Sequence, residues 1–382
     1  MKYILLFLVT LLSLSVVSAQ VKYEKIESSK LGESREIKIQ LPRGYGSDKG
    51  KSYPLFIVFD GDYLFEAVAG NTDYYAYWED MPDAIVVGIN QYGTRYDDCL
   101  YSEQNSLPVE TGASFFEFVG MELIPYLERN YNIGNFKVAV GHGETANFIN
   151  YYLLKPQPLF QAYIVISPVL APGMVTYLPR QLSNSQSKLF YYLAYTNNDL
   201  PQVQDMTKIL NEDLTAVNNE NVTYKYQGFE GPSHYSVPTH ALPSAIELIF
   251  SVYKPISKKE YQDVILKLEE SPVAYLEEKY KTIQDLFGIE KTILVNDFRA
   301  ISAAIEKNES FEDFERLGDL AREAYPKTLL GNYYLARFYE ETGDPKKAMK
   351  TYQSAYILDE IGGITRDLMV EKAEAIKTDF GY

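Results

Sequence analysis

Val138-Ala139-Val140-Gly141-His142-Gly143-Glu144-Thr145-Ala146 is the stretch that decides how this chain folds. An apolar run ends in a glycine, and a segment compatible with a helix follows it. This is the frame of G-x-S-x-G, a sharp strand-to-helix turn that exposes a nucleophilic serine. The central position here is Gly143, and glycine has no side chain with which to form a covalent intermediate. The sequence therefore predicts a nucleophile elbow that lacks its nucleophile.

Strand-like and helix-like segments alternate on both sides of this turn, between residues 21 and 255. The strand-like segments are rich in Val, Ile, Tyr and Phe, and several are continuous apolar runs, as in strands covered on both faces. They span residues 21–26, 35–41, 55–60, 84–90, 136–141, 162–167, 189–196 and 222–229. Helices are expected at residues 113–129, 144–154, 202–217 and 241–253. The alternation predicts a mostly parallel eight-stranded sheet with helices on both faces.

The N-terminus has the pattern of a cleaved secretory signal over residues 1–19. Lys2 supplies a positive charge, residues 4–17 are almost wholly apolar or Ser/Thr, and Val17-Ser18-Ala19 is a small-x-small cleavage site. The apolar stretch is too short for a stable membrane span. A lipid anchor is not expected either, because the cleavage site has no cysteine near it. The mature chain is expected to be periplasmic or secreted, with no membrane span.

Composition excludes some classes of partner. The 382 residues carry a formal net charge of −16, which disfavours binding to nucleic acid or to an anionic membrane surface. Cys99 is the only cysteine, so no intrachain disulfide can form despite the exported context. A hydrophobic content of 46% in a chain of this length supports a large core and two domains.

The composition of the sequence changes at residues 254–257. Beyond this point charged residues are more frequent and no strand-like segments follow. We expect an α/β domain over residues 20–255 and an all-α domain over residues 256–382. Ser257 and Glu260 have the spacing of a helix-capping box. Residues 329–360 fit one tetratricopeptide-like hairpin, with Gly343-Asp344-Pro345 at its turn. Two interpretations stay open, namely a hairpin that only packs and a module that binds a partner through Tyr333, Tyr334, Tyr339 and Tyr352.

An ordered series of short motifs between residues 21 and 253 is similar to one protein family. The motifs are Phe59-Asp60-Gly61-Asp62-Tyr63-Leu64-Phe65, Val86-Val87-Gly88-Ile89-Asn90 with Arg95 and Asp97, Phe115–Phe118 with Glu122–Tyr126, Gly141-His142, Ser167-Pro168, and Gly231–Pro238. Together they resemble the esterase family of α/β-hydrolases that includes enterochelin and feruloyl esterases. The helical C-terminal tail is similar to one found in Bacteroidetes-type members. The resemblance implies the α/β-hydrolase fold.

The resemblance also implies which positions belong to the catalytic site. The nucleophile of the family falls on Gly143, the general base on His234, and the acid that orients the histidine on Asp199. The oxyanion hole would use the backbone N–H of Glu144 and one from the Gly61-Asp62 turn. Glu144 departs from the small residue that the family carries there, and its carboxylate would oppose negative charge developing on a substrate.

Other interpretations of these residues are weaker. Thr145 is offset from the elbow by two positions, which turns a helical side chain about 200° away, so we expect a structural role for it. His142 and His234 with Glu144 or Asp199 lack a metal-ligand spacing, so no metal or other cofactor is expected.

The aspartates Asp60, Asp62, Asp97 and Asp98 lack the register of a calcium loop and are expected to cap loops, one of them pairing with Arg95. The same loop aspartates are expected to raise the thiol pKa of Cys99.

The sequence thus favours an exported esterase-family protein that is catalytically inactive and acts by binding. The ligand would be a small ester, sugar or peptide in the vestigial pocket, or the helical domain would hold an envelope protein partner. The rival hypothesis is an active ester hydrolase whose nucleophile is not identified, or whose Gly143 is an engineered replacement of serine.

Overall fold

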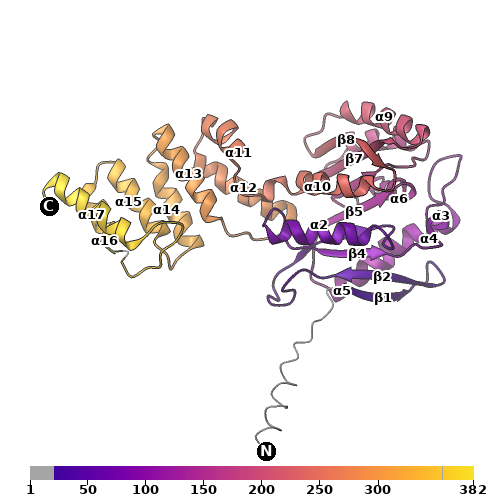
Figure 1. Cartoon of the computed structure of the whole chain (residues 1–382), viewed down its shortest axis with the longest axis horizontal. Helices are drawn as coiled ribbons and strands as arrows, with labels where there is room; N and C mark the ends of the chain where they lie inside the picture. Colours follow the sequence, from indigo (N-terminus) through magenta and orange to yellow (C-terminus); the bar gives the residue numbers. More distant parts are fainter. Residues whose placement is uncertain (1–20, 355) are drawn as a thin grey trace, which may run out of the picture. The chain divides into compact units, whose positions relative to one another are not determined.

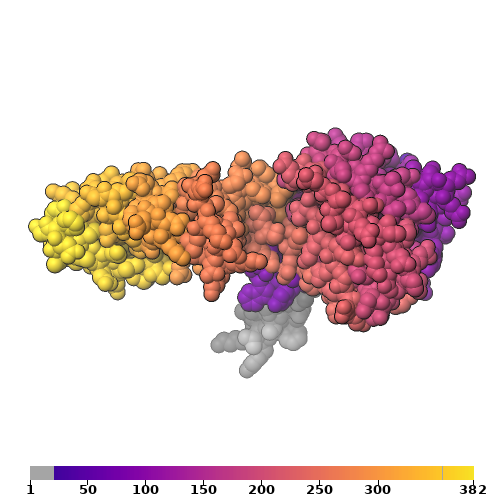
Figure 2. Space-filling model, turned by 90° about the horizontal axis from the view of Figure 1, so that it is seen from above, coloured from indigo at the N-terminus to yellow at the C-terminus, as the bar shows by residue number. Residues whose placement is uncertain are grey.

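The structure is a computed structural model that describes residues 21–354 and 356–382. The expected signal segment, residues 1–19, lies outside the described residues. The chain divides into two compact units (Figure 1, Figure 2). The first unit consists of the chain up to Tyr77 together with Pro82–Ile249. The second unit consists of Trp78–Met81 and Phe250–Tyr382. None of the helices in the described ranges combines the length and apolar character that crossing a lipid bilayer requires.

The first unit is built on an eight-stranded sheet with the order β1-β2-β4-β3-β5-β6-β7-β8. The strands are β1 (Val21–Glu27), β2 (Ser34–Gln40), β3 (Tyr53–Val58), β4 (Ile85–Ile89), β5 (Ile133–His142), β6 (Ala162–Ile166), β7 (Leu189–Asn198) and β8 (Val222–Ser233). β1 pairs with β2 and β2 with β4 in antiparallel fashion, and all other pairs are parallel. The expected mostly parallel sheet of eight strands is confirmed.

Helices cover both faces of this sheet, as expected from its apolar strands. β3, β4 and β6 are buried along their whole length. One face carries α2 (Phe65–Tyr77) and α10 (Val237–Ile249), which contact each other (Figure 1). On the other face, alternate strand residues such as Ile57, Ala139 and Val165 join a core with side chains of the remaining helices. These helices are α4 (Glu110–Glu117), α5 (Ile124–Asn130), α6 (Glu144–Phe148), α7 (Asn150–Leu153), α8 (Met174–Ser183) and α9 (Pro201–Thr215). The four-residue helix α3 (Arg95–Asp98) precedes α4.

The expected helices form with shifted bounds. The helix expected at residues 113–129 is α4 and α5 joined by a π-helical turn, η1 (Phe118–Leu123), so the helical path runs unbroken past Pro125. α10 begins four residues before the expected residue 241. Three helices, α2, α3 and α8, were not predicted. α3 has only four residues and α8 contains Pro179, so neither has a long, clean apolar period.

The second unit is helical throughout its regular elements. They are η2 (Ser251–Tyr253), α11 (Lys258–Asp263), η3 (Ile265–Lys267), α12 (Pro272–Phe287), α13 (Val295–Asn308), α14 (Asp313–Ala324), α15 (Leu330–Glu341), α16 (Pro345–Ser354) and α17 (Arg366–Phe380). The capping box at Ser257 and Glu260 is confirmed, with both reciprocal hydrogen bonds present. The all-α character of the C-terminal region is confirmed as well.

The hairpin of α15 and α16 uses two of its expected partner-binding tyrosines for its own packing. Tyr334 and Tyr352 are each 1% exposed. Tyr334 packs between Phe298 of α13 and Phe314 of α14, and Tyr352 donates a hydrogen bond to Glu340. The prediction that these two rings lie on an exposed, partner-binding face is therefore wrong, because the preceding helices bury them.

A buried ion pair fixes the short helix α3 against the sheet. Arg35 of β2 donates from Nη1 and Nη2 to the two carboxylate oxygens of Asp98, at 2.6 and 3.0 Å, and both side chains are at most 6% exposed. Gln91 and Thr94 donate to the same carboxylate. The pair therefore holds the loop between β4 and α4, which carries Arg95.

We expect Asp98→Ala to lower the free energy of unfolding of the first unit by about 3–5 kcal/mol, because the buried Arg35 charge would lose its partner. Urea unfolding monitored by circular dichroism measures the change. Asp97→Ala is the matched control, since Asp97 is exposed, and its effect should stay within about 0.5 kcal/mol. Equal effects of the two substitutions would contradict the role assigned to the pair.

Candidate functional site

The elbow at Gly143 has the sharp backbone turn that its sequence frame predicts. β5 ends at His142, Gly143 has φ 64° and ψ −120°, and α6 begins at Glu144. Both backbone groups of Gly143 are paired, its N–H with the carbonyl of Ile166 at 3.0 Å and its carbonyl with the N–H of Val169 at 3.0 Å. A positive φ of this kind is strained for any residue with a Cβ atom. The turn thus keeps the geometry that displays a nucleophile, without the nucleophile.

His234 and Asp199, separated in sequence, meet beside this turn. Asp199 follows β7 and His234 follows β8, and His234 Nδ1 lies 2.7 Å from Asp199 Oδ1. The other carboxylate oxygen of Asp199 accepts hydrogen bonds from the Thr196 N–H at 2.9 Å and the Ser167 hydroxyl at 2.7 Å. Burial opposes ionisation of Asp199, but the bonds from His234, Thr196 and Ser167 together hold its pKa below the ordinary value. The acid is therefore ionised and orients the histidine ring.

The second nitrogen of His234 faces the place where a side chain at position 143 would begin. A Cβ atom built on Gly143 would lie 3.6 Å from His234 Nε2. A hydroxyl one bond further out would be within hydrogen-bond reach of this nitrogen. The structure therefore brings together Gly143, His234 and Asp199 in the order of a catalytic triad, with its first member missing.

Arg95 lies against the elbow on the other side. Its Nη2 would be 3.0 Å from the same Cβ position, and it donates to the carbonyl of His142 at 2.8 Å. Its Nε donates to Asp60 Oδ1 at 2.6 Å, and its Nη1 pairs with Glu144. The expected pairing of Arg95 with a loop aspartate is thus confirmed, and the partner is Asp60. Burial disfavours its charge, yet Asp60 and Glu144 raise the pKa of Arg95, so the guanidinium stays charged.

Asp60 is the centre of the hydrogen bonds under the elbow. Besides Arg95, it accepts bonds from the Thr145 hydroxyl at 2.6 Å and the Tyr63 hydroxyl at 3.0 Å. Burial raises the pKa of Asp60, although the bonds from Arg95, Thr145 and Tyr63 oppose the rise. Thr145 is completely buried and also accepts the His142 N–H at 3.0 Å. The expected structural role of Thr145 is therefore confirmed, because its hydroxyl points inward to Asp60.

His142 is held neutral beside His234. Its Nε2 donates to the carbonyl of His234 at 3.0 Å, and its Nδ1 is an acceptor 2.9 Å from the Tyr63 hydroxyl, whose one proton is shared between this nitrogen and Asp60. The rings of His142 and His234 are 4.4 Å apart between centroids. Burial, with the nearby His234 and Arg95, lowers the pKa of His142 to about 3. A neutral ring can therefore support the His234 loop without repelling Arg95.

The two expected sources of oxyanion-hole hydrogen bonds differ. The N–H of Gly61 donates to the carbonyl of Ile89 at 2.7 Å, so it is occupied within the backbone. Asp62 is the member of that turn that remains as a candidate, and its side chain accepts the Gln91 N–H at 3.1 Å. The N–H of Glu144 belongs to the first residue of α6, where no preceding turn of the helix supplies an acceptor.

The remaining side chains singled out in the sequence have structural contacts. Within residues 21–354 and 356–382, no group of three His, Cys, Asp or Glu side chains is arranged to hold a metal ion. Cys99 is buried, and this burial, with Asp60 and Asp98 nearby, raises its thiol pKa well above the ordinary value. The loop aspartates thus have the expected effect, but burial contributes more.

Sequence reasoning did not anticipate the roles of Ser167 and Tyr63. Both stood inside recognised motifs, yet nothing in those motifs shows which side chain they contact. Ser167 has a φ of 45° and is completely buried, and strained, buried polar residues often lie at functional sites. Only the positions of β6 and β7 side by side bring Ser167 to Asp199.

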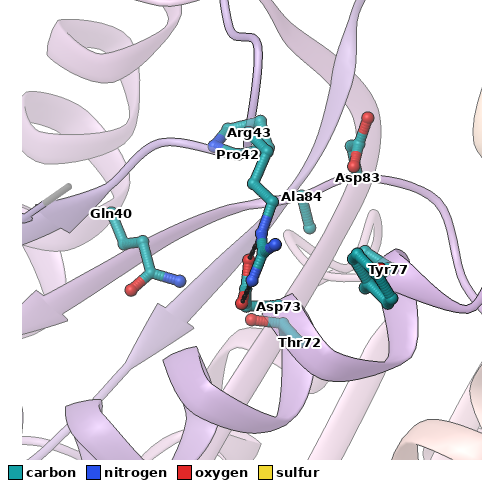
Figure 3. Close-up of a pocket in the computed structure, with 9 residues that line it drawn as sticks. Gln40, Pro42, Arg43, Thr72, Asp73, Tyr77, Asp83 and Ala84 are labelled. Atoms are coloured by element: carbon teal, nitrogen blue, oxygen red, sulfur yellow. Dashed lines mark hydrogen bonds and ion pairs between the residues drawn. The ribbon is translucent and has the colours of Figure 1, made fainter.

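A small hollow at the other end of the sheet does not belong to this site. It measures about 30 Å³ and lies between the end of β2 and the last turns of α2, with Ala84 just before β4 (Figure 3). Arg43 points across it to Asp73, with Nε and Nη2 at 2.8 and 2.6 Å from the carboxylate oxygens. Ligands of parallel sheets bind at the carboxyl ends of the strands, where Gly143 lies. This hollow lies at the amino ends of the parallel strands instead.

The low pKa of His142 predicts how the protein responds to acid. An unfolded histidine takes up a proton near pH 6.5, but the folded His142 does so only near pH 3. Between these values the unfolded chain binds the extra proton, so the stability that neutral His142 contributes falls as the pH falls. We expect the urea midpoint to drop more steeply from pH 7 to pH 4.5 in the parent than in His142→Gln. The exposed His240 supplies the matched variant, His240→Gln, whose slope should equal that of the parent. A parallel slope for His142→Gln would show that His142 is not held neutral.

Comparisons with known proteins agree with this architecture. Residues 28–228, more than half of the chain, match the family model described as Putative esterase. The crystal structure of an uncharacterised protein from Capnocytophaga ochracea is 32% identical, with a TM-score of 0.86, over 94% of this chain and 100% of that one. A comparison with curated proteins finds no match.

Two more distant structures share the fold alone. An IroE-like serine hydrolase from Shewanella oneidensis is 21% identical, with a TM-score of 0.59, over 79% of this chain and 99% of that one. The siderophore hydrolase EstA from Aspergillus nidulans is 15% identical, with a TM-score of 0.52, over 63% and 97% of the two chains. The strand order, the elbow and the family match lead to one conclusion: this chain belongs to the Putative esterase family and has the α/β-hydrolase fold, followed by a helical C-terminal region.

Proposed function

We propose that this protein is an exported, catalytically inactive member of the esterase family that binds a ligand at the elbow. One observation carries the proposal: the residue at the tip of the elbow is Gly143, while the turn around it is intact. A serine-type esterase needs a hydroxyl at this point to form its acyl intermediate. Neither Thr145 nor Ser167 replaces it, because their hydroxyls donate to Asp60 and Asp199 inside the protein.

The surroundings of Gly143 also suit binding better than acyl transfer. The guanidinium of Arg95 approaches the place of the missing side chain to within 3.0 Å of its Cβ position. Glu144 places a carboxylate beside the N–H group that would stabilise an oxyanion, and pairs with Arg95. The charges beside the elbow, on Arg95 and Glu144, are therefore paired with each other and do not stabilise a transition state.

Exposed apolar side chains next to the site support ligand binding. Tyr96, Leu200 and Tyr235 are 73%, 72% and 86% exposed, and they directly follow Arg95, Asp199 and His234. Exposed apolar side chains that adjoin the polar groups of a site can contribute to a binding surface. A small ester, sugar or peptide fits a site that offers apolar contact around His234 and Arg95.

Export and a role for the helical unit belong to the same proposal. Export rests on the signal pattern of residues 1–19, and a domain boundary at 254–257 rests on the change in sequence texture. A scaffold role for a tetratricopeptide-like hairpin has less support than ligand binding, because Tyr334 and Tyr352 are buried in their own unit. An envelope protein partner would have to use other side chains.

A second candidate function is hydrolysis by an activated water molecule. The observation that favours it is the intact pair of Asp199 and His234, 2.7 Å apart, with Nε2 facing the elbow. A histidine oriented in this way can act as a general base toward water as well as toward serine. Such an enzyme would hydrolyse esters without forming an acyl intermediate.

We expect no stoichiometric labelling of the purified protein by a fluorophosphonate probe, and no turnover of short acyl esters beyond a residual rate of order 10³-fold over water. Labelling, read by intact-protein mass spectrometry, separates the hypotheses. Labelling at any serine or threonine would mean that a nucleophile exists and the proposal is wrong. Turnover without labelling that disappears in His234→Ala would establish the water mechanism instead.

Restoring the hydroxyl should cost stability. Gly143→Ser places a Cβ at a φ of 64° and 3.0 Å from Arg95 Nη2, so we expect it to lower the free energy of unfolding by about 1 kcal/mol or more. Because His234 faces the new hydroxyl, slow labelling by the same probe is expected, and it should vanish in Gly143→Ser/His234→Ala.

The matched control for that variant is Gly70→Ser, which adds a hydroxyl in open space on α2 and should show neither effect. Full stability of Gly143→Ser with no labelling would mean that the elbow is unstrained and that His234 is not positioned as a base.

A further inference from the structure

A second, larger hollow lies on the helical layer of the first unit. It has a volume of about 340 Å³, at the lower end of the range of small-molecule sites. Its walls come from the loop before α4, from α4 itself and from the end of α7. They are mostly apolar, and the lining residues are Leu107, Pro108, Ala113, Phe116, Glu117, Tyr151, Leu154 and Lys155.

The floor of this hollow is aromatic and packs on the core of the first unit. Phe116 stacks on the completely buried ring of Tyr152, with 4.5 Å between centroids and 15° between planes. Tyr151 is also buried, and its hydroxyl accepts a hydrogen bond from Asn147. Leu107, by contrast, is 40% exposed at the rim. The hollow thus has a preformed apolar base and an open side.

One charge at the rim is available to a ligand. Glu117 is neutralised by Lys30, whose Nζ lies 2.7 Å from its carboxylate. The ammonium of Lys155 lies 5.4 Å from the centre of the Phe116 ring, and in the described part of the chain it forms no ion pair. The site therefore presents one unpaired positive charge above an apolar floor.

This hollow is separate from the elbow. Leu154 lies eleven residues beyond Gly143 along α6 and α7, which is roughly 16 Å at the rise of an α-helix. None of its lining residues is Gly143, His234, Asp199 or Arg95. Binding in this hollow is therefore independent of the function proposed for the elbow.

We propose that this hollow binds an amphipathic monocarboxylate, with its carboxylate at Lys155 and its apolar chain over Phe116 and Tyr151. Charge complementarity selects an anion, because the acid at the rim is already paired and the lysine is not. The apolar walls select a hydrocarbon chain, since each buried methylene favours binding about fourfold.

Decanoate, used below its micelle-forming concentration, is the probe, and isothermal titration calorimetry of the purified protein is the measurement. We expect one binding site, with octanoate about fifteenfold weaker because it has two fewer methylenes. Decyltrimethylammonium should bind at least tenfold more weakly, because its charge has the opposite sign. Lys155→Glu should weaken decanoate at least tenfold. Ala113→Phe, which fills the hollow without changing charge, should do the same.

Two further variants locate the binding. Lys208→Glu makes the same charge change on α9, at an exposed lysine outside the hollow, and should leave the dissociation constant unchanged. His234→Ala should also leave it unchanged, because the elbow is a different site. Absence of binding, equal binding by Lys155→Glu, or loss of binding in His234→Ala alone would each overturn the proposal, and none of these outcomes bears on whether the elbow forms an acyl intermediate.

Discussion

The buried carboxylate of Asp60 is the constraint on which the site depends. It lies at the end of β3 with a φ of 56°, and its N–H donates to Gln91 at 2.9 Å. Arg95 of α3 and Thr145 of α6 donate to its carboxylate, so one residue joins the segments that follow the three neighbouring strands β4, β3 and β5. An unpaired carboxylate at this depth would be costly, and therefore these partners are held closely. The position of Arg95 against the elbow follows from this network.

The elbow retains some features of a catalytic site and lacks others. A strained backbone and an oriented His234–Asp199 pair are what acyl transfer requires, and both are present. The atom that would attack the substrate is missing, and the guanidinium of Arg95 lies close to its place. Fold and family alone would suggest an esterase, yet chemistry depends on the groups at the site. Binding at the elbow is the function that uses what is retained without requiring what is missing.

How well the sequence predicted the structure varied with the kind of feature. The central strands β3, β4 and β6 were predictable because each is a short apolar run between turn residues, and buried parallel strands need that pattern. The capping box at Ser257 was predictable because it depends on residues three apart. α8 and the backbone partner of the Gly61 N–H were not predicted. Pro179 obscures the period of the helix, and Gly61 pairs with Ile89 only because the turn after β3 packs against β4.

The sequence by itself determined the family, the order of strands and helices along the chain, and the absence of a side chain at Gly143. These features are local, or consist of local motifs in a fixed order. Only the tertiary structure decided that His234 faces the elbow, that Ser167 supports Asp199, and that Arg95 lies 3.0 Å from a Cβ built on Gly143. The physical reason is that parallel strands bring their carboxyl ends to one edge of the sheet, so residues far apart in sequence meet there at distances that no spacing encodes.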